Sequence, residues 1–208
     1  MKTFLLQGDS ITDAGRSRDN DGVLGYGYPT LVAAEIMHDY PGEFNVINRG
    51  ISGNRVVDLY ARIKRDFINL KPDYLSILIG VNDVWHEYSD EPNGVSDDKY
   101  RMVYDLLIQE IKAEFPHIKI YILEPFVLRG TATEAHWDDF AREVPLRAVS
   151  AQWLAEKLGL PFISLQDKFD AACEKCEASY WLRDGVHPTA AGHQLIARAL
   201  MEAVKKDL

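Results

Sequence analysis

The sequence feature that most constrains the fold is the alternation of five short apolar runs with longer segments of helical spacing. The runs cover residues 3–7, 44–48, 74–79, 119–123 and 161–164. They hold several β-branched and aromatic residues, as the buried strands of parallel sheets usually do. Strands that alternate with helices are joined by right-handed crossovers, which place helices on the faces of the sheet. The sequence therefore predicts an α/β fold, a three-layer α/β/α sandwich around a five-stranded parallel sheet.

The segments between these runs carry apolar residues at helical spacing. In one of them, an i, i+3, i+4, i+7 pattern is formed by Val56, Leu59, Tyr60, Ile63 and Phe67. Similar spacing predicts further helices over residues 100–111, 144–158 and 190–204. Polar or glycine-rich composition predicts loops beside the carboxyl ends of the strands, over residues 15–27, 87–98 and 130–137.

Length and charge limit the class of protein. A chain of 208 residues can bury one full hydrophobic core, so we expect a single domain over residues 1–208. The formal net charge of −9 disfavours nucleic acid and anionic membrane surfaces as partners, because both favour basic patches. No apolar run approaches the roughly 18 residues of a membrane span, and the first run is too short for a signal peptide. We therefore expect a cytoplasmic protein.

The two cysteines, Cys173 and Cys176, are spaced as a CxxC pair. Such a pair can be a redox motif or half of a zinc site. No second CxxC or HxxxH pair completes a metal set, and no predicted strand directly precedes the pair as in a redox motif. We therefore interpret them as two thiols one turn apart on a helix, and we expect no metal site.

A serine follows the first apolar run, in Gly8-Asp9-Ser10. In open parallel α/β sheets the working crevice lies just outside the carboxyl ends of the strands. Ser10 is therefore placed as a candidate nucleophile. The G-x-S-x-G elbow of α/β-hydrolases does not fit, because Thr12 stands where the second glycine would be.

A candidate base lies near the other end of the chain, in Asp184-Gly185-Val186-His187-Pro188. Pro188 disfavours helix at His187, so both polar residues should lie on the loop before the last predicted helix. From three positions away, the Asp184 carboxylate can reach Nδ1 of His187 and leave Nε2 free for a serine. A helix-capping aspartate with an incidental histidine is the alternative interpretation of this segment taken alone.

Two further segments follow the second and third runs, at the same edge of the sheet. They are Arg49-Gly50-Ile51-Ser52-Gly53-Asn54 and Gly80-Val81-Asn82-Asp83. The N–H groups of Ser10 and Gly53 and the side-chain amide of Asn82 could form an oxyanion hole, each donor contributing on the order of 3 kcal/mol. Gly53 as a helix-entry turn and Asn82 as an Asx turn are alternatives for each segment alone. The convergence of four segments on one crevice favours a catalytic site.

These segments resemble the four sequence blocks of the GDSL, or SGNH, hydrolases. The matching blocks are Gly8-Asp9-Ser10, Gly53, Gly80-Val81-Asn82-Asp83 and Asp184-Gly185-Val186-His187, with Ile11 where the family name has leucine. Within the family, the motifs GDSIT, NRGISGN, GVNDVW and DGVHPTAAGH are most similar to the intracellular acetylxylan esterases.

The resemblance implies a role for each matching residue. Ser10 would be the nucleophile, His187 the general base and then acid, and Asp184 the group that orients His187. Ser10, Gly53 and Asn82 would supply the oxyanion hole. The resemblance also implies a flavodoxin-like fold, no cofactor and a homo-oligomer.

The residues around these blocks suggest the kind of ester. Tyr26, Trp85 and Trp181 are predicted beside the crevice, where they could stack on sugar rings or simply pack the loops. Asp9, next to the nucleophile, is a fourth candidate for substrate contact. No lid insertion, long apolar groove or lipid-binding segment is evident, which favours a small acyl group on a polar alcohol.

We therefore expect a serine esterase that removes acetyl groups from xylo-oligosaccharides or related sugars through an acyl-serine. A thioesterase or lysophospholipase of the same superfamily is the alternative enzyme. A non-catalytic carbohydrate-binding protein is the alternative outside enzymes, and the intact Ser10, Asn82, Asp184 and His187 argue against it.

Overall fold

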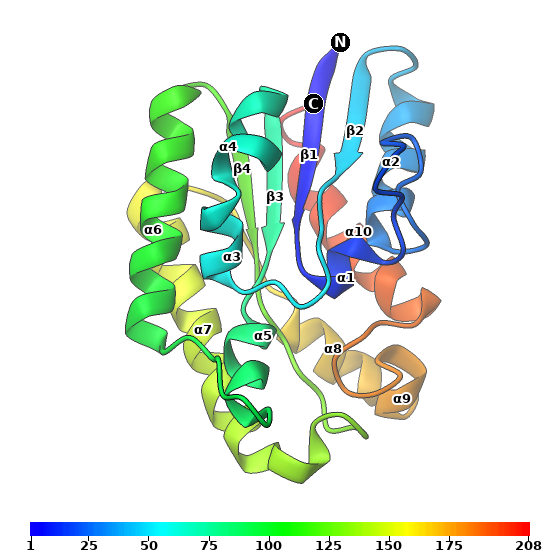
Figure 1. Ribbon diagram of the computed structural model, residues 1–208. Coiled ribbons are helices and arrows are strands. Elements are labelled where there is room, and N and C mark those ends of the chain that lie inside the picture. The colour runs from blue at the N-terminus through cyan, green and yellow to red at the C-terminus, as the bar shows by residue number, and fades with distance from the viewer.

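A computed structural model describes residues 1–208, and its five strands form one parallel sheet in the order β2-β1-β3-β4-β5 (Figure 1). The strands are β1 Lys2–Gly8, β2 Phe44–Asn48, β3 Tyr74–Leu78, β4 Lys119–Leu123 and β5 Phe162–Ile163. The predicted sheet is therefore confirmed. The fifth strand is shorter than its apolar run, because it pairs with β4 through two residues only.

Both faces of the sheet are covered, as the apolar strands require. Successive side chains of a strand point to opposite faces, and in β1 Phe4 and Leu6 pack into one buried cluster whereas Leu5 packs into another. All three side chains are fully buried. Burial of each contributes roughly 1.5–3 kcal/mol, so the central strand that carries the candidate nucleophile is firmly held.

The helices lie on both faces and at the carboxyl edge of the sheet (Figure 1). The helices of eight or more residues are α2 Tyr28–Asp39, α6 Asp97–Glu114, α7 Trp137–Leu158, α8 Gln166–Cys173 and α10 Ala190–Val204. The short helices are α1 Ser10–Asp13, α3 Val56–Ala61, α4 Ile63–Asp66, α5 Val81–Trp85 and α9 Ala178–Trp181. Three 3-10 turns complete the chain: η1 Ile68–Leu70, η2 His86–Tyr88 and η3 Glu134–His136.

The helical pattern over residues 56–67 is interrupted in the structure. α3 ends before Arg62, whose φ of −110° and ψ of 16° lie outside the helical range. The buried Arg62 guanidinium donates to Asn54 Oδ1 at 2.8 Å and to Asp66 Oδ2 at 3.2 Å. These tertiary contacts outweigh helical propensity at this position, and the apolar side of the pattern, including Leu59 and Phe67, remains buried.

The two cysteines are not both helical. Cys173 is the last residue of α8 and Cys176 lies in the bend that follows, and both are free thiols. No group of three or more His, Cys, Asp or Glu side chains is arranged to hold a metal ion. None of the helices combines the length and the apolar content that crossing a membrane requires.

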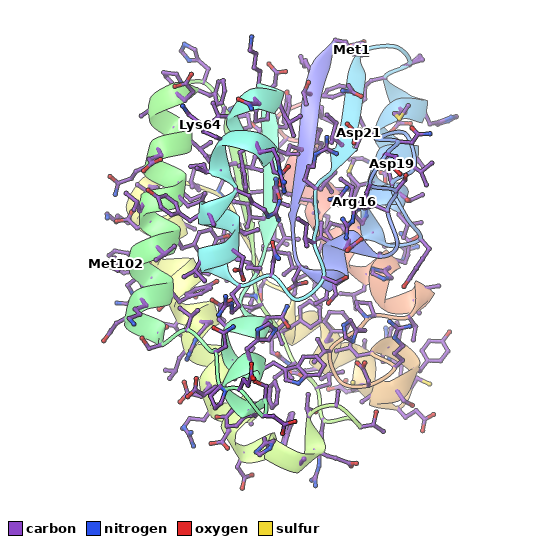
Figure 2. All side chains as sticks on the ribbon, viewed as in Figure 1. Met1, Arg16, Asp19, Asp21, Lys64 and Met102 are labelled. Atoms are coloured by element: carbon purple, nitrogen blue, oxygen red, sulfur yellow. The ribbon has the colours of Figure 1, made fainter.

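The segment 15–27 has no regular helix or strand, as predicted. Figure 2 shows Arg16, Asp19 and Asp21 along it, beside β2 and α2. Arg16 Nε donates to the carbonyl of Gly50 at 2.7 Å, and Asp21 forms an ion pair with Arg49. The loop therefore holds residues 49 and 50, which follow β2, through a hydrogen bond and an ion pair.

Candidate active site

Ser10 lies where β1 ends and α1 begins. The Asp9 side chain caps α1 by accepting the N–H of Ile11 at 2.9 Å, and Ser10 is the first helical residue. A Cβ on Gly8 would lie 2.3 Å from the carbonyl oxygen of Leu78 and 2.3 Å from Oγ1 of Thr12. Only glycine therefore lets the turn that carries Ser10 pack this closely against β3.

Ser10, His187 and Asp184 form one hydrogen-bonded chain. Ser10 Oγ lies 2.9 Å from His187 Nε2, and His187 Nδ1 lies 2.7 Å from Asp184 Oδ2. An antiparallel bridge between Leu182 and Pro188 closes the loop that carries the last two residues, just before α10. The structure thus joins the end of β1 to a loop 177 positions further along the chain.

The Asp184 carboxylate is held in its ionised form. Burial acts to raise its pKa, but hydrogen bonds from the His187 ring and from the N–H groups of His187 and Val186 lower the pKa to about 2. The two backbone groups donate to Oδ1 at 2.8 and 3.0 Å, which leaves Oδ2 for the ring. The carboxylate can therefore keep the Nδ1 proton in place and stabilise an imidazolium.

Three donors that could stabilise an oxyanion lie around the same cavity. Ser10 is the first residue of α1, so its N–H has no partner within that helix. Gly53, with φ of +80°, makes no hydrogen bond through its N–H. The Asn82 amide donates one N–H to the carbonyl of Asn54 at 3.1 Å, which leaves the second for a ligand.

Two aspartates hold the Gly53 turn from opposite sides. Asp13 Oδ2 accepts the N–H and the hydroxyl of Ser52 at 3.0 and 2.9 Å. The Asp83 carboxylate accepts the N–H of Val56 at 3.1 Å. Asp13 is not among the residues predicted from the sequence; its position four residues after Asp9, on the first turn of the helix that Ser10 begins, is the one signal that could have indicated it.

Two carboxyl groups are buried next to site residues: Asp9 precedes Ser10, and Asp83 follows Asn82. Burial raises the pKa of Asp9 to about 7, despite the opposing effects of the Ile11 N–H and of His187. Burial likewise raises the pKa of Asp83 to about 8, against the Val56 N–H and the charge of Arg147. Both groups therefore favour the protonated form more strongly than an exposed aspartate does.

A cavity of about 330 Å³ opens over Ser10 and His187. Trp85 forms one wall, its ring centroid 5.8 Å from that of His187 and 6.1 Å from that of Phe140. The complete lining is Ser10, Ser52, Gly53, Asn82, Trp85, His86, Tyr88, Ser89 and His187. The lining contains serine and amide groups, imidazoles and aromatic rings.

Of the four predicted substrate contacts, only Trp85 lines this cavity. Asp9 is 1% exposed and its carboxyl is turned to the backbone of α1. Tyr26 lies instead against His193, with ring centroids 6.3 Å apart, and Trp181 lines a separate cavity between α8 and α10. Sequence position alone does not specify the direction of these side chains. Asp9, Tyr26 and Trp181 lie outside the lining of this cavity, and contact of these three residues with substrate stays a prediction.

His193 is a buried structural histidine. Its Nδ1 accepts the N–H of Tyr28 at 3.2 Å, which joins α10 to the start of α2. Burial and the nearby Arg183 and His187 lower its pKa to about 4, so it stays neutral near neutral pH.

The geometry agrees with what comparisons with known proteins show. A family model described as the GDSL-like Lipase/Acylhydrolase family matches residues 6–195. The chain belongs to this family. The predicted family is therefore confirmed, and so is its hydrolase class.

Relatives of this GDSL-like hydrolase include acetylxylan esterases. One from Geobacillus stearothermophilus is 36% identical over 211 residues, which are 97% of this chain and 93% of the relative. A solved acetylxylan esterase from the same organism has a TM-score of 0.86 at 35% identity and covers 98% of this chain and 94% of its own. A GDSL-like lipase from Parabacteroides merdae has a TM-score of 0.92 at 37% identity, with 98% and 95% covered. These likenesses confirm the predicted fold. The predicted homo-oligomer stays a prediction.

Proposed function

We propose that this hydrolase is a serine esterase that removes acetyl groups from xylo-oligosaccharides or related acetylated sugars. The observation that carries the proposal is the lining of the cavity over Ser10. The lining contains no aliphatic side chain and no carboxylate, amine or guanidinium group. Long acyl chains need apolar walls, and charged ligands need a counter-charge. Neutral hydroxyl, amide and aromatic groups instead fit a small acyl group on a sugar.

In the proposed reaction, His187 Nε2 takes the proton of Ser10 while Oγ attacks the acetyl carbonyl carbon. The N–H groups of Ser10 and Gly53 and the free N–H of Asn82 then stabilise the oxyanion. The protonated His187 gives its proton to the departing sugar oxygen, which leaves an acetyl ester on Ser10. Water, deprotonated by His187, attacks this ester and releases acetate, and the proton returns to Ser10.

The acetylxylan esterase from Geobacillus stearothermophilus, at 36% identity, supports the choice of sugar. The test is an ester panel with release of the carboxylic acid of each substrate as the readout: acetylated xylo-oligosaccharides, other acetylated sugars, nitrophenyl esters of increasing acyl length, an acyl-CoA and a lysolipid. We expect turnover of the sugar acetates and a steep loss of activity as the acyl chain grows. A preference for octanoyl or longer esters without sugar deacetylation would overturn the proposal in favour of a lipase or thioesterase.

The covalent step has its own test. Rapid quenching of the enzyme during turnover of an activated acetyl ester should yield protein that carries one acetyl group, and peptide mapping should place it on Ser10. The Ser10→Ala variant is the control. Acetate release without any acetyl-enzyme in the wild type, under conditions where deacylation limits the rate, contradicts the acyl-serine mechanism.

A further inference from the structure

We propose that His86 binds a hydroxyl group of the sugar that leaves when Ser10 attacks the ester. The inference rests on the proposed esterase function and names the part of the site that selects the alcohol. None of the roles described above uses this histidine, although it lines the catalytic cavity.

The position of His86 follows from the turn that carries Asn82. α5 ends at Trp85, and His86 begins the next 3-10 turn; both residues line the cavity. A methyl group placed on Gly53 would lie 4.0 Å from both Cε1 and Nε2 of His86. The imidazole therefore lies close to Gly53, whose N–H is a proposed donor to the oxyanion. A substrate with its carbonyl oxygen near Gly53 would bring its neighbouring atoms within reach of His86.

The ring nitrogens of His86 are free for a ligand. The backbone carbonyl of His86 accepts the N–H of Asn93 at 2.9 Å and the hydroxyl of Ser89 at 3.0 Å, whereas its ring makes no hydrogen bond within the chain. Four other polar side chains of the lining already have partners or roles. Ser52 donates its hydroxyl to Asp13, and Ser10, Asn82 and His187 belong to the reacting centre.

The charge of His86 fits a neutral hydroxyl. Burial lowers its pKa, the guanidinium of Arg55 lowers it further, and Asp58 acts in the opposite direction. Arg55 is itself bound to Asp58 at 2.9 Å and to Asn93, so it is not free to bind an anion. A neutral imidazole has one donor and one acceptor nitrogen, and a hydroxyl group can both donate and accept a hydrogen bond. His86 is thus suited to a sugar hydroxyl rather than to a carboxylate or phosphate.

The test compares two substrates in the His86→Ala variant. An acetylated xylo-oligosaccharide offers hydroxyl groups beside the ester, and nitrophenyl acetate offers none. We expect kcat/KM for the sugar to fall about tenfold, mainly through KM, as for loss of one hydrogen bond. We expect kcat/KM for nitrophenyl acetate to stay within about twofold of the wild type. His86→Gln keeps a donor and an acceptor, and we expect it to recover part of the sugar activity.

His136→Ala is the matched control. The His136 ring stacks on Tyr88 with centroids 4.7 Å apart, but His136 does not line the cavity. An equal loss on both substrates in His86→Ala, or no loss on either, overturns the role of His86. A wild-type enzyme that hydrolyses nitrophenyl acetate but no sugar acetate overturns the proposed function, and with it this inference. The wild-type result therefore distinguishes failure of the His86 role from failure of the proposed function.

Discussion

Replacing Asp184 by asparagine should impair the enzyme more than its small change in shape suggests. Asp184 Oδ1 accepts two backbone N–H groups. Oδ2 lies 2.7 Å from Nδ1 of His187 and accepts its proton. In Asp184→Asn, the amide oxygen must take the Oδ1 position, because the NH₂ group cannot accept those two donors. The NH₂ group then faces His187 Nδ1, which must become an acceptor. The ring proton moves to Nε2, and Nε2 can no longer accept the proton of Ser10.

We expect kcat to fall by roughly 10³–10⁴-fold, the size of effect known for a histidine base held in the wrong tautomer. The assay is kcat on a short nitrophenyl ester, with Asp184→Ala as the comparison. Alanine leaves both tautomers available, so Asp184→Asn should be no more active than Asp184→Ala. An asparagine variant that keeps a tenth of the wild-type kcat, or is clearly more active than the alanine variant, would refute the tautomer argument.

The same carboxylate contributes to stability. The pKa of Asp184 falls from 3.8 to about 2 in the folded chain, so the ionised carboxylate stabilises the folded chain above pH 4. At 1.36 kcal/mol for each pKa unit this is at most about 2.5 kcal/mol, and about 1 kcal/mol once solvent screening is included. Because the folded pKa is depressed, this contribution is lost as the pH falls through 4 towards 2. The difference in free energy of unfolding between wild type and Asp184→Asn should therefore narrow over that range, and a constant difference would contradict the linkage.

Three further variants test the rest of the site. Ser10→Ala should abolish ester turnover with an unchanged circular dichroism spectrum; residual turnover near the wild-type rate would remove Ser10 as nucleophile. Asn82→Ala should lower kcat about 10²–10³-fold with little change in KM, since its amide is a proposed donor to the oxyanion; a pure KM effect would place it in substrate binding instead. The unfolded chain ionises Asp83 near pH 3.8 and the folded chain near pH 8, so its contribution to stability falls as pH rises between those values. Urea unfolding of Asp83→Asn should lack this part of the fall, and identical pH profiles of the two proteins would contradict it.

The layers of the fold could be predicted because buried parallel strands leave a strong signal. The runs around Leu5 and Ile77 are apolar on both faces, and each observed strand lies within about two residues of its run. The interruption at Arg62 could not be predicted, because it depends on contacts with Asn54 and Asp66 that only the folded chain provides.

The candidate site likewise has residues that the sequence predicted and residues that it did not. Ser10, Gly53, Asn82, Asp184 and His187 follow strands or precede a helix, so topology alone places them at one edge of the sheet. The cavity walls depend instead on side-chain direction. Aromatic composition pointed equally to Tyr26, Trp85 and Trp181, and only the middle one lines the cavity. His86, which lines the cavity, was missed, although it directly follows the motif GVNDVW that contains Asn82.

The hydrogen bond between Ser10 and His187 joins residues 177 positions apart, and this sets when activity can begin. At a synthesis rate of 5–20 residues per second, a nascent chain carries Ser10 for roughly 10–35 s before His187 has been made. During that time Ser10 has no proton acceptor at Nε2, whatever part of the sheet has already formed. Under the proposed mechanism, the chain therefore cannot cleave esters until the loop before α10 closes on the end of β1.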